Sequence, residues 1–135
     1  MDVNDYQIGG SHYKGGYQHW DWIIELNMHY LFACATKYII RWKDKNGIED
    51  LRKAVHYLAK ADDRCIHFYK YETHQKIMLV NTRYSGFFNS IGEQEREIIL
   101  AILQDNIIIA QHLLSVLISE AELGIEADSA YTNQG

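Results

Sequence analysis

The chain of 135 residues contains no proline and only two cysteines. Without proline, no residue removes a backbone donor or clashes with the preceding helical turn, so long helices are permitted. Cys34 and Cys65 show neither a CxxC motif nor the Cys/His spacing of a metal site. This pattern favours two small buried hydrophobic side chains in a reducing compartment.

Signals for export and for membrane insertion are also missing. The N-terminal stretch MDVNDYQIGG has neither the basic region nor the apolar region of a signal peptide. The most apolar segment is interrupted by five polar residues, Gln104, Asp105, Asn106, Gln111 and His112. We therefore expect a cytoplasmic protein with no membrane partner.

Basic charge is scarce overall but concentrated in one segment. The net charge of -5 argues against binding to a nucleic acid polymer, which needs a basic footprint. Between Lys37 and Lys60, however, seven basic residues stand against three acidic ones, a local charge of +4. A local basic patch in an acidic protein is typical of a site for a small anionic ligand.

The apolar spacing predicts a mainly α fold with a helical hairpin core. We expect an irregular arm over 1–17, helices over 19–28 and 30–42, a turn at 44–47, and a third helix ending near Tyr71. The third helix shows the clearest apolar stripe, at spacings of three and four residues: Leu51, Ala54, Leu58, Ala61, Cys65 and Phe68.

The C-terminal half has a different character. Residues 76–84 suit one short strand or hairpin, and residues 93–123 predict one long helix that Gly124 caps before a frayed tail. This helix is apolar on more than one face, which favours burial against a partner subunit. We therefore expect a homo-oligomer formed through 93–123, with regions 1–72 and 73–135 together making one domain.

The basic residues follow helical spacing. Lys37, Arg41 and Lys45 lie four apart, and Asp50, Lys53, Tyr57 and Lys60 fall on a single face of the third helix. In a helical hairpin the two faces would meet around one cleft. Because arginine offers a planar fork and lysine a compact charge, this set suits phosphate. The alternative is a solvated helix face that carries charge for solubility.

An ordered set of motifs adds to this interpretation: Ser11-His12-Tyr13-Lys14, Trp20-Asp21-Trp22-Ile23, Lys37-Tyr38-Ile39-Ile40-Arg41 and the run from Glu49 to Leu58. The set resembles a family of small phage proteins described as nucleotide kinase-like, with an HY element, a KYxxRxxxK helix end and a DLxKAxxYL helix. The resemblance covers residues 6–60. It implies a site that binds nucleotide phosphates through His12, Tyr13, Lys37, Arg41, Lys45, Asp50, Lys53 and Tyr57.

The resemblance also implies phosphoryl transfer to deoxynucleoside monophosphates without a Walker A loop, and this chain contains no GxxxxGK[ST]. A nucleoside triphosphate would then be the phosphate donor, and side-chain cations would position it. The family usually carries a glycine–asparagine step where this chain has Ala33 and Cys34. A thiol cannot supply the paired donor and acceptor of an amide.

Three functions therefore remain open. The first is a nucleotide kinase-like phosphotransferase, and the second is a non-catalytic anti-defence sponge that sequesters a nucleotide-derived signal. The third is a helical interaction scaffold. The seven histidines show no HExxH or comparable spacing, so we expect no metal site, and no serine or cysteine lies in a nucleophile elbow.

Overall fold

The computed structural model describes residues 19–67 and 90–134, with side chains as far as Gly124. These residues are mainly helical, as the sequence predicts. The elements are α1 (His19–Leu26), α2 (Tyr30–Arg41), the short 3-10 helix η2 (Trp42–Asp44), α3 (Ile48–Asp63), α6 (Glu93–Leu103) and α7 (Ile107–Gln134). The strand or hairpin predicted near 76–84 and the arm over 1–17 lie outside the described residues.

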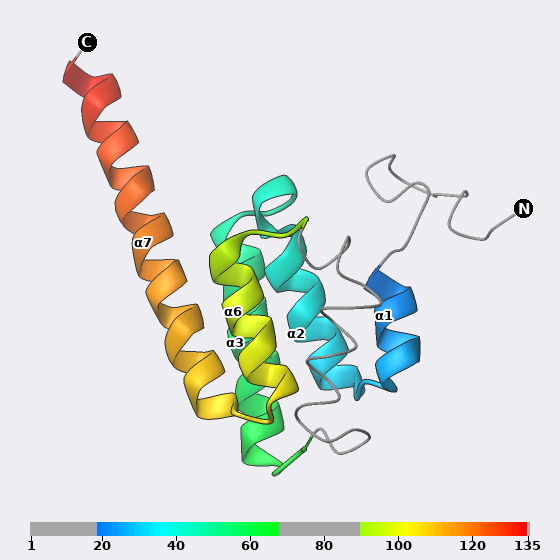
Figure 1. Cartoon of the computed structure of the whole chain (residues 1–135). Coiled ribbons are helices and arrows are strands. Elements are labelled where there is room, and N and C mark those ends of the chain that lie inside the picture. The colour runs from blue at the N-terminus through cyan, green and yellow to red at the C-terminus, as the bar shows by residue number, and fades with distance from the viewer. Residues whose placement is uncertain (1–18, 68–89, 135) are drawn as a thin grey trace, which may run out of the picture.

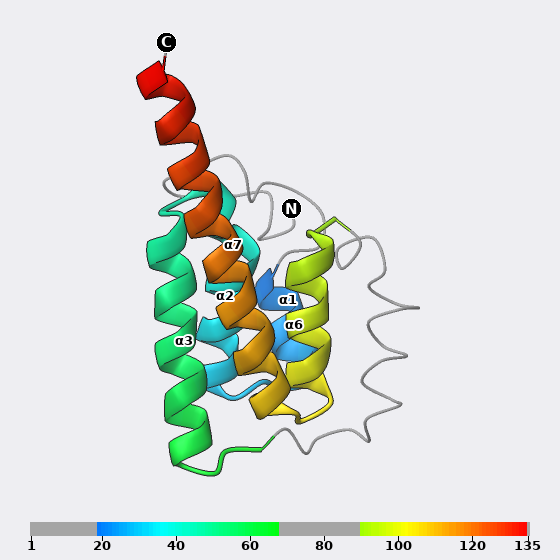
Figure 2. The same ribbon diagram turned by 90° about the vertical axis from the view of Figure 1, so that its left-hand side faces the viewer.

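Two antiparallel helical hairpins pack against each other (Figures 1 and 2). The first hairpin is α2 with α3, and the second is α6 with α7. Across the junction, α3 packs on α7 and α2 packs on α6, so four helices surround one core, with α1 beside α2. The C-terminal part of α7 extends beyond the other helices.

The core takes its side chains from both hairpins and from α1. Its largest fully buried members are Trp22, Phe32, Leu26, Ile39, Leu51, Leu58, Ile98, Ile99, Ile102 and Leu103. Burial of one such side chain contributes about 1.5–3 kcal/mol relative to exposure. The N-terminal and C-terminal regions therefore share a single hydrophobic core.

Helix α3 has the predicted apolar stripe but ends earlier than predicted. Leu51, Ala54, Leu58 and Ala61 are fully buried, which confirms the stripe as far as Ala61, whereas Phe68 lies outside the described residues. The helix nevertheless ends at Asp63, earlier than the predicted Tyr71. The prediction that Cys65 is buried is wrong, because Cys65 lies just past the helix end and is exposed.

The single helix predicted over 93–123 is also wrong, because the chain turns back at Gln104–Asn106 and forms the α6–α7 hairpin. Asp105 adopts a φ of 60°, in the left-handed region. The Asn106 amide donates to the Ala101 carbonyl at 2.8 Å, and its side-chain oxygen accepts from Ile109 N at 3.3 Å. Asp105 and Asn106 thus end one helix and begin the next, so α6 and the inner face of α7 bury each other.

At its other end, α7 continues where a cap was predicted. Gly124 does not end the helix, which runs on to Gln134 through the segment expected to be a frayed tail. Gly124 has no positive φ, and a Cβ added there would meet nothing within 4 Å. A helix-interior glycine costs only about 1 kcal/mol relative to alanine, which the rest of the helix outweighs.

One stretch of α7 is long and apolar enough to cross a membrane. This stretch is Ile107–Gly124, with 18 residues, a mean hydropathy of 1.4 and 22% of its residues buried. A single helix of this kind is weak evidence for insertion, since helices of soluble proteins have the same length and composition. The inner face of the stretch packs on α6 and α3.

Three helices end with the same backbone motif. Asn27, Cys65 and Asp105 each have a positive φ, of 48°, 54° and 60°. In α3, for example, Cys65 N donates to Asp62 O at 3.1 Å and Ile66 N donates to Ala61 O at 2.9 Å. This pair of bonds is the Schellman motif, which glycine usually completes.

Replacement of Cys65 by glycine should therefore stabilise the protein. Left-handed backbone costs an ordinary residue about 1–2 kcal/mol, part of which is offset by the greater freedom of glycine in the unfolded chain. We expect Cys65→Gly to raise the free energy of unfolding by about 0.5–1 kcal/mol in urea titrations. Cys65→Val should lower it, because a β-branched residue tolerates this conformation poorly. Equal stability of the two variants would contradict the account.

Candidate functional site

The turn between α2 and α3 positions the first residue of the site. Gly47 has a φ of 63° and a ψ of -137°, a conformation that residues with a Cβ rarely adopt. Its amide donates to Trp42 O at 2.8 Å, and Asp50 N donates to Gly47 O at 2.9 Å. These contacts place Asp50 in the first turn of α3, where the helix dipole favours a carboxylate.

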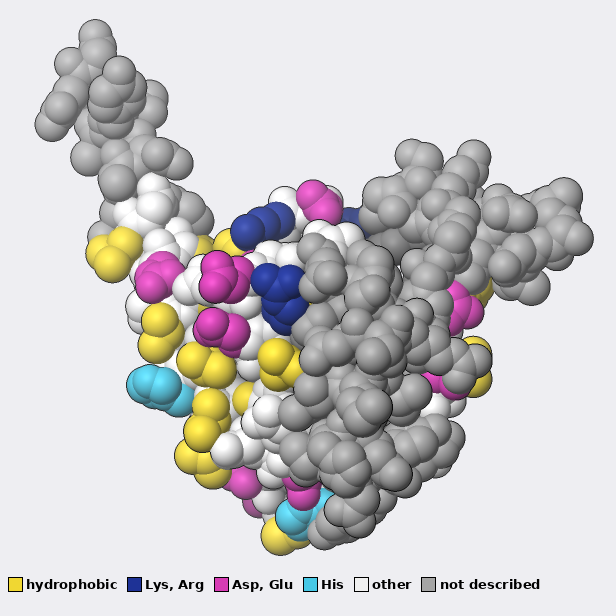
Figure 3. Space-filling model, in the orientation of Figure 1, with side chains coloured by type: hydrophobic (Ala, Val, Ile, Leu, Met, Phe, Trp, Pro, Cys, Tyr) yellow, Lys and Arg dark blue, Asp and Glu magenta, His cyan; other side chains and the backbone are white. Residues whose placement is uncertain are grey.

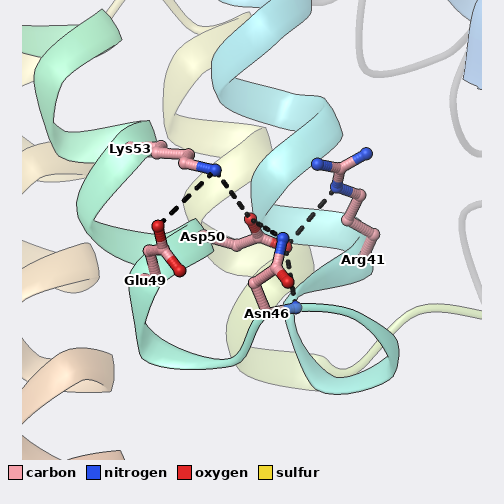
Figure 4. A network of polar contacts seen from close by, with 5 residues as sticks. All are labelled: Arg41, Asn46, Glu49, Asp50 and Lys53. Atoms are coloured by element: carbon pink, nitrogen blue, oxygen red, sulfur yellow. Dashed lines mark hydrogen bonds and ion pairs between the residues drawn. The ribbon is translucent and has the colours of Figure 1, made fainter.

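Asp50 is fully buried and holds α2, the turn and α3 together (Figure 4). Its carboxylate accepts from the backbone N of Asn46 at 3.3 Å and from Asn46 Nδ2 at 3.4 Å. Arg41 Nε lies 3.5 Å from Oδ2, and Lys53 Nζ lies 3.9 Å from Oδ1. A buried carboxylate needs such partners because an uncompensated charge in the interior is costly.

Three cations gather around the ring of Tyr38. The distances to its centroid are 4.8 Å from Lys37 Nζ, 4.7 Å from Arg41 Cζ and 5.4 Å from Lys53 Nζ. Each lies within the range of about 6 Å in which a cation is attracted to an aromatic face. Lys37 and Arg41 come from α2 and Lys53 from α3, so the hairpin brings together two of the predicted faces.

Tyrosines extend this cation cluster along the hairpin. Tyr57 of α3 stacks on Tyr38, with centroids 5.8 Å apart and an interplanar angle of 17°. Tyr30 meets Tyr57 edge to face at 6.2 Å. The neighbouring Cys34 and partial burial raise the pKa of Tyr57 to about 12, and a hydrogen bond with Cys34 raises the pKa of Tyr30. Both hydroxyls therefore remain protonated near neutral pH and can donate hydrogen bonds.

The cations retain binding capacity. Figure 4 shows the two terminal nitrogens of Arg41 pointing away from Asp50, which the side chain approaches only through Nε. Over the residues that the structure describes, no carboxylate pairs with Lys37. A guanidinium fork and an ammonium group near one aromatic ring can together bind the oxygens of an anionic group.

The structure brings together five of the eight residues predicted for the site: Lys37, Arg41, Asp50, Lys53 and Tyr57. His12 and Tyr13 lie outside the described residues. Lys45 does not continue the helical row of Lys37 and Arg41, because α2 ends at Arg41 and Lys45 lies exposed in the turn after η2. The row of cations that four-residue spacing predicted along one face therefore stops at Arg41, while the role of Lys45 in the site stays a prediction.

Tyr38 and Tyr30 are the members of the cluster that the sequence did not single out as site residues. Tyr38 is the residue around which all three cations lie. Its position directly after Lys37 and three before Arg41 was a usable signal. The stacking on Tyr57 depends on the register of the hairpin, which spacing within one helix does not give.

A second buried carboxylate contacts the chain just after the C-terminal end of α2. Glu95 of α6 accepts from Trp42 Nε1 at 2.8 Å and lies 3.6 Å from Lys43 Nζ. A Cβ on Gly92 would collide with the Glu95 carboxylate, so a larger residue at that helix start would require the Glu95 side chain to move. This contact joins the two hairpins beside the cluster.

No metal centre is formed by the residues that the structure describes, where no group of three or more His, Cys, Asp or Glu side chains could hold an ion. The two carboxylates nearest the cluster, Glu49 and Asp50, both pair with Lys53. The cluster is therefore one of cations and aromatic rings.

Residues 9–59 match the model of a family described as a protein of unknown function, DUF3310. The match covers 51 of the 135 residues, and all eight residues predicted for the site lie within it. No curated protein and no solved structure matches the chain. The family description gives no function, so the resemblance to nucleotide kinase-like proteins stays a prediction.

Behind the cluster, His19 of α1 contacts α2. Its Nε2 lies 2.9 Å from Thr36 Oγ1, which itself donates to the Phe32 carbonyl at 2.9 Å. Because Thr36 uses its proton in that bond, its oxygen is left to accept from Nε2 of His19. Burial, followed by the charge of Lys37, lowers the pKa of His19 to about 4.

The protein should consequently lose stability on mild acidification. The unfolded chain binds a proton at His19 from about pH 6.5, whereas the folded chain does so only near pH 4. The free energy of unfolding therefore falls as the pH drops between these values, by up to about 3 kcal/mol. We expect His19→Gln to flatten this slope in urea titrations across the window. An unchanged slope would contradict the assignment.

Proposed function

We propose that the chain binds the phosphates of a nucleotide at the α2–α3 hairpin. The supporting observation is the convergence of Lys37, Arg41 and Lys53 on Tyr38, with Tyr57 stacked beside it. Charged donors suit phosphate oxygens, and the adjoining tyrosine rings offer faces and hydroxyls to a base or a sugar. The resemblance to phage nucleotide kinase-like proteins points to the same ligand, and with it to the cytoplasm of an infected host.

Asp50 has a positioning role in this proposal. Its buried carboxylate fixes Arg41 and Lys53 in place and leaves the terminal nitrogens of Arg41 directed away. A guanidinium held in this way loses less side-chain entropy when a phosphate binds. The proposed site also includes His12, Tyr13 and Lys45. Only the resemblance to nucleotide kinase-like proteins supports these three residues.

Lys37 gives the cleanest test of binding. We expect Lys37→Ala to weaken binding of deoxynucleoside mono- and triphosphates by about 1.5–3 kcal/mol, the range of charge-assisted hydrogen bonds, or about 10- to 150-fold in Kd. Isothermal titration calorimetry measures this directly. Because Lys37 has no described carboxylate partner, thermal stability should change little. Arg41→Ala and Lys53→Ala should weaken binding too, but both also destabilise the fold by leaving Asp50 less compensated.

Lys60→Ala is the matched control. Spacing places Lys60 on the same face of α3, but its side chain is exposed and it is not one of the three cations around Tyr38. The variant removes the same charge and should leave the Kd within a factor of about two. Unaltered binding in both lysine variants, or no binding by the natural chain, would contradict the proposal. The basic residues would then form a solvated helix face, and the helical interaction scaffold would be the favoured function.

Cys34 favours a binding protein over an enzyme. It occupies the position at which the resembled family usually has asparagine, and it is 7% exposed, under Tyr30 and Tyr57. If that amide orients the transferring phosphate, its absence leaves cationic binding intact and removes an interaction of the transition state. We therefore propose a sponge for a nucleotide or nucleotide-derived signal, with the nucleoside monophosphate kinase as the competing function.

Mass spectrometry of released ligands separates the two. We expect the natural chain to return bound nucleotides unchanged and to consume no ATP when deoxynucleoside monophosphates are present. The double variant Ala33→Gly with Cys34→Asn should gain phosphoryl transfer at a similar Kd, because only turnover depends on the amide. Robust transfer by the natural chain would refute the sponge.

A further inference from the structure

The outer face of α7 carries an apolar stripe that no described part of the chain covers. The inner face, with Ile107, Ala110, Leu114 and Leu117, is buried against α6 and α3. On the opposite side Ile109, Val116 and Leu123 recur at intervals of seven residues and are 49%, 38% and 63% exposed. Figure 3 shows exposed hydrophobic side chains along this side of the molecule.

Ile109, Val116 and Leu123 occupy one position of the seven-residue repeat with which one helix packs along another. Between the three apolar positions lie His112 and Ser119, both exposed. The stripe is therefore narrow and one-sided. Such a face suits a partner helix better than a bilayer, which would surround α7 and require its inner face to leave the core.

Polar contacts also hold α7 on the body of the protein. Arg52 of α3 contacts Glu122 at 2.5 Å, and Gln94 of α6 donates to Glu120 at 2.6 Å. Withdrawal of α7 into a membrane would break both contacts and would place two carboxylates in or near the bilayer. The occupant of the stripe should therefore approach α7 while the helix stays docked.

We propose that the outer stripe of α7 binds the same stripe of a second copy of the chain, in antiparallel orientation and crossing near Val116. The charges of α7 support this partner. Its described acidic residues, Glu120 and Glu122, both lie on the C-terminal side of Val116, whereas Ile107–Ser119 contains no Asp, Glu, Lys or Arg. A parallel pair would bring these carboxylates of the two copies together, and an antiparallel pair separates them.

The antiparallel arrangement is complementary in shape as well. A two-fold axis near Val116 brings Ile109 level with Leu123 of the second copy, and His112 level with Glu120. The same axis brings Ile108, which is 65% exposed, level with Gly124, where a Cβ would meet open space. In this arrangement Ile108 fills the space beside Gly124, and Ile109 packs on Leu123. The imidazole of His112 lies next to the carboxylate of Glu120. The contact is isologous, as two-fold dimers require.

The predicted role of residues 93–123 in oligomerisation is thereby narrowed to one face of α7. Ile102, taken with the rest of 93–123 as part of the interface on sequence grounds, is fully buried in the chain's own core. Ile109 and Val116 are the residues available to a partner.

Sedimentation and light scattering test the association. We expect the natural chain to be a dimer, with twice the chain mass of 15.8 kDa. The Val116→Asp variant should be a monomer with an unchanged circular dichroism spectrum. Val55→Asp on α3 is the control, because Val55 has the same 38% exposure outside the stripe. A monomeric natural chain, or dissociation by Val55→Asp as well, would overturn the proposal.

Disulfide trapping tests the orientation, in a Cys65→Ser background that removes the exposed thiol. Val116→Cys should link to itself, and Ile109→Cys should link to Leu123→Cys when the two proteins are mixed, since such bonds need Cα atoms about 5.5–6 Å apart. Self-linkage of Ile109→Cys would show a parallel pair and contradict the proposal. Co-sedimentation of the natural chain with phosphatidylcholine–phosphatidylglycerol vesicles would identify the stripe as a membrane surface instead.

Discussion

The contact between Arg41 and the buried carboxylate of Asp50 determines much of the geometry of the N-terminal hairpin. It joins the last residue of α2 to the first turn of α3 across a turn that only Gly47 can complete at low cost. Asn46 and Lys53 supply further partners to the same carboxylate. With that charge satisfied, Lys37 and Tyr38 on one helix lie level with Lys53 and Tyr57 on the other. The cation cluster is a consequence of how the hairpin closes.

The sequence predicted the parts of this structure that depend on local spacing. The apolar stripe of α3 as far as Ala61, the helix that begins at Tyr30 and the glycine turn follow from periodicity and from backbone preferences, and all are present. Helical spacing also identified five residues of the candidate site: Lys37, Arg41, Asp50, Lys53 and Tyr57. Tyr38 was not, because its importance arises from contacts between helices.

The errors have a common physical cause. Helix ends at Cys65 and Asp105 use left-handed residues other than glycine, so the usual signal for a stop was missing. Gly124, which does carry that signal, lies inside a helix that continues through it. In each case hydrogen bonds and packing outweighed a preference of about 1 kcal/mol. The apolar segment 93–123 consequently folds back on itself as α6 and α7. The contact between these two helices buries one of the apolar faces that the sequence analysis assigned to a partner subunit.

Helix α3 connects the two surfaces on which the proposed activities depend. Consecutive residues contact different partners, since Arg52 contacts Glu122 of α7 and Lys53 contacts Asp50 beside the cation cluster. The contact with α7 and the cation cluster therefore use different faces of α3. A second copy bound at the stripe would leave the cations of each chain accessible. A dimer of this kind could carry two separate ligand sites while α3 keeps their positions fixed relative to the interface.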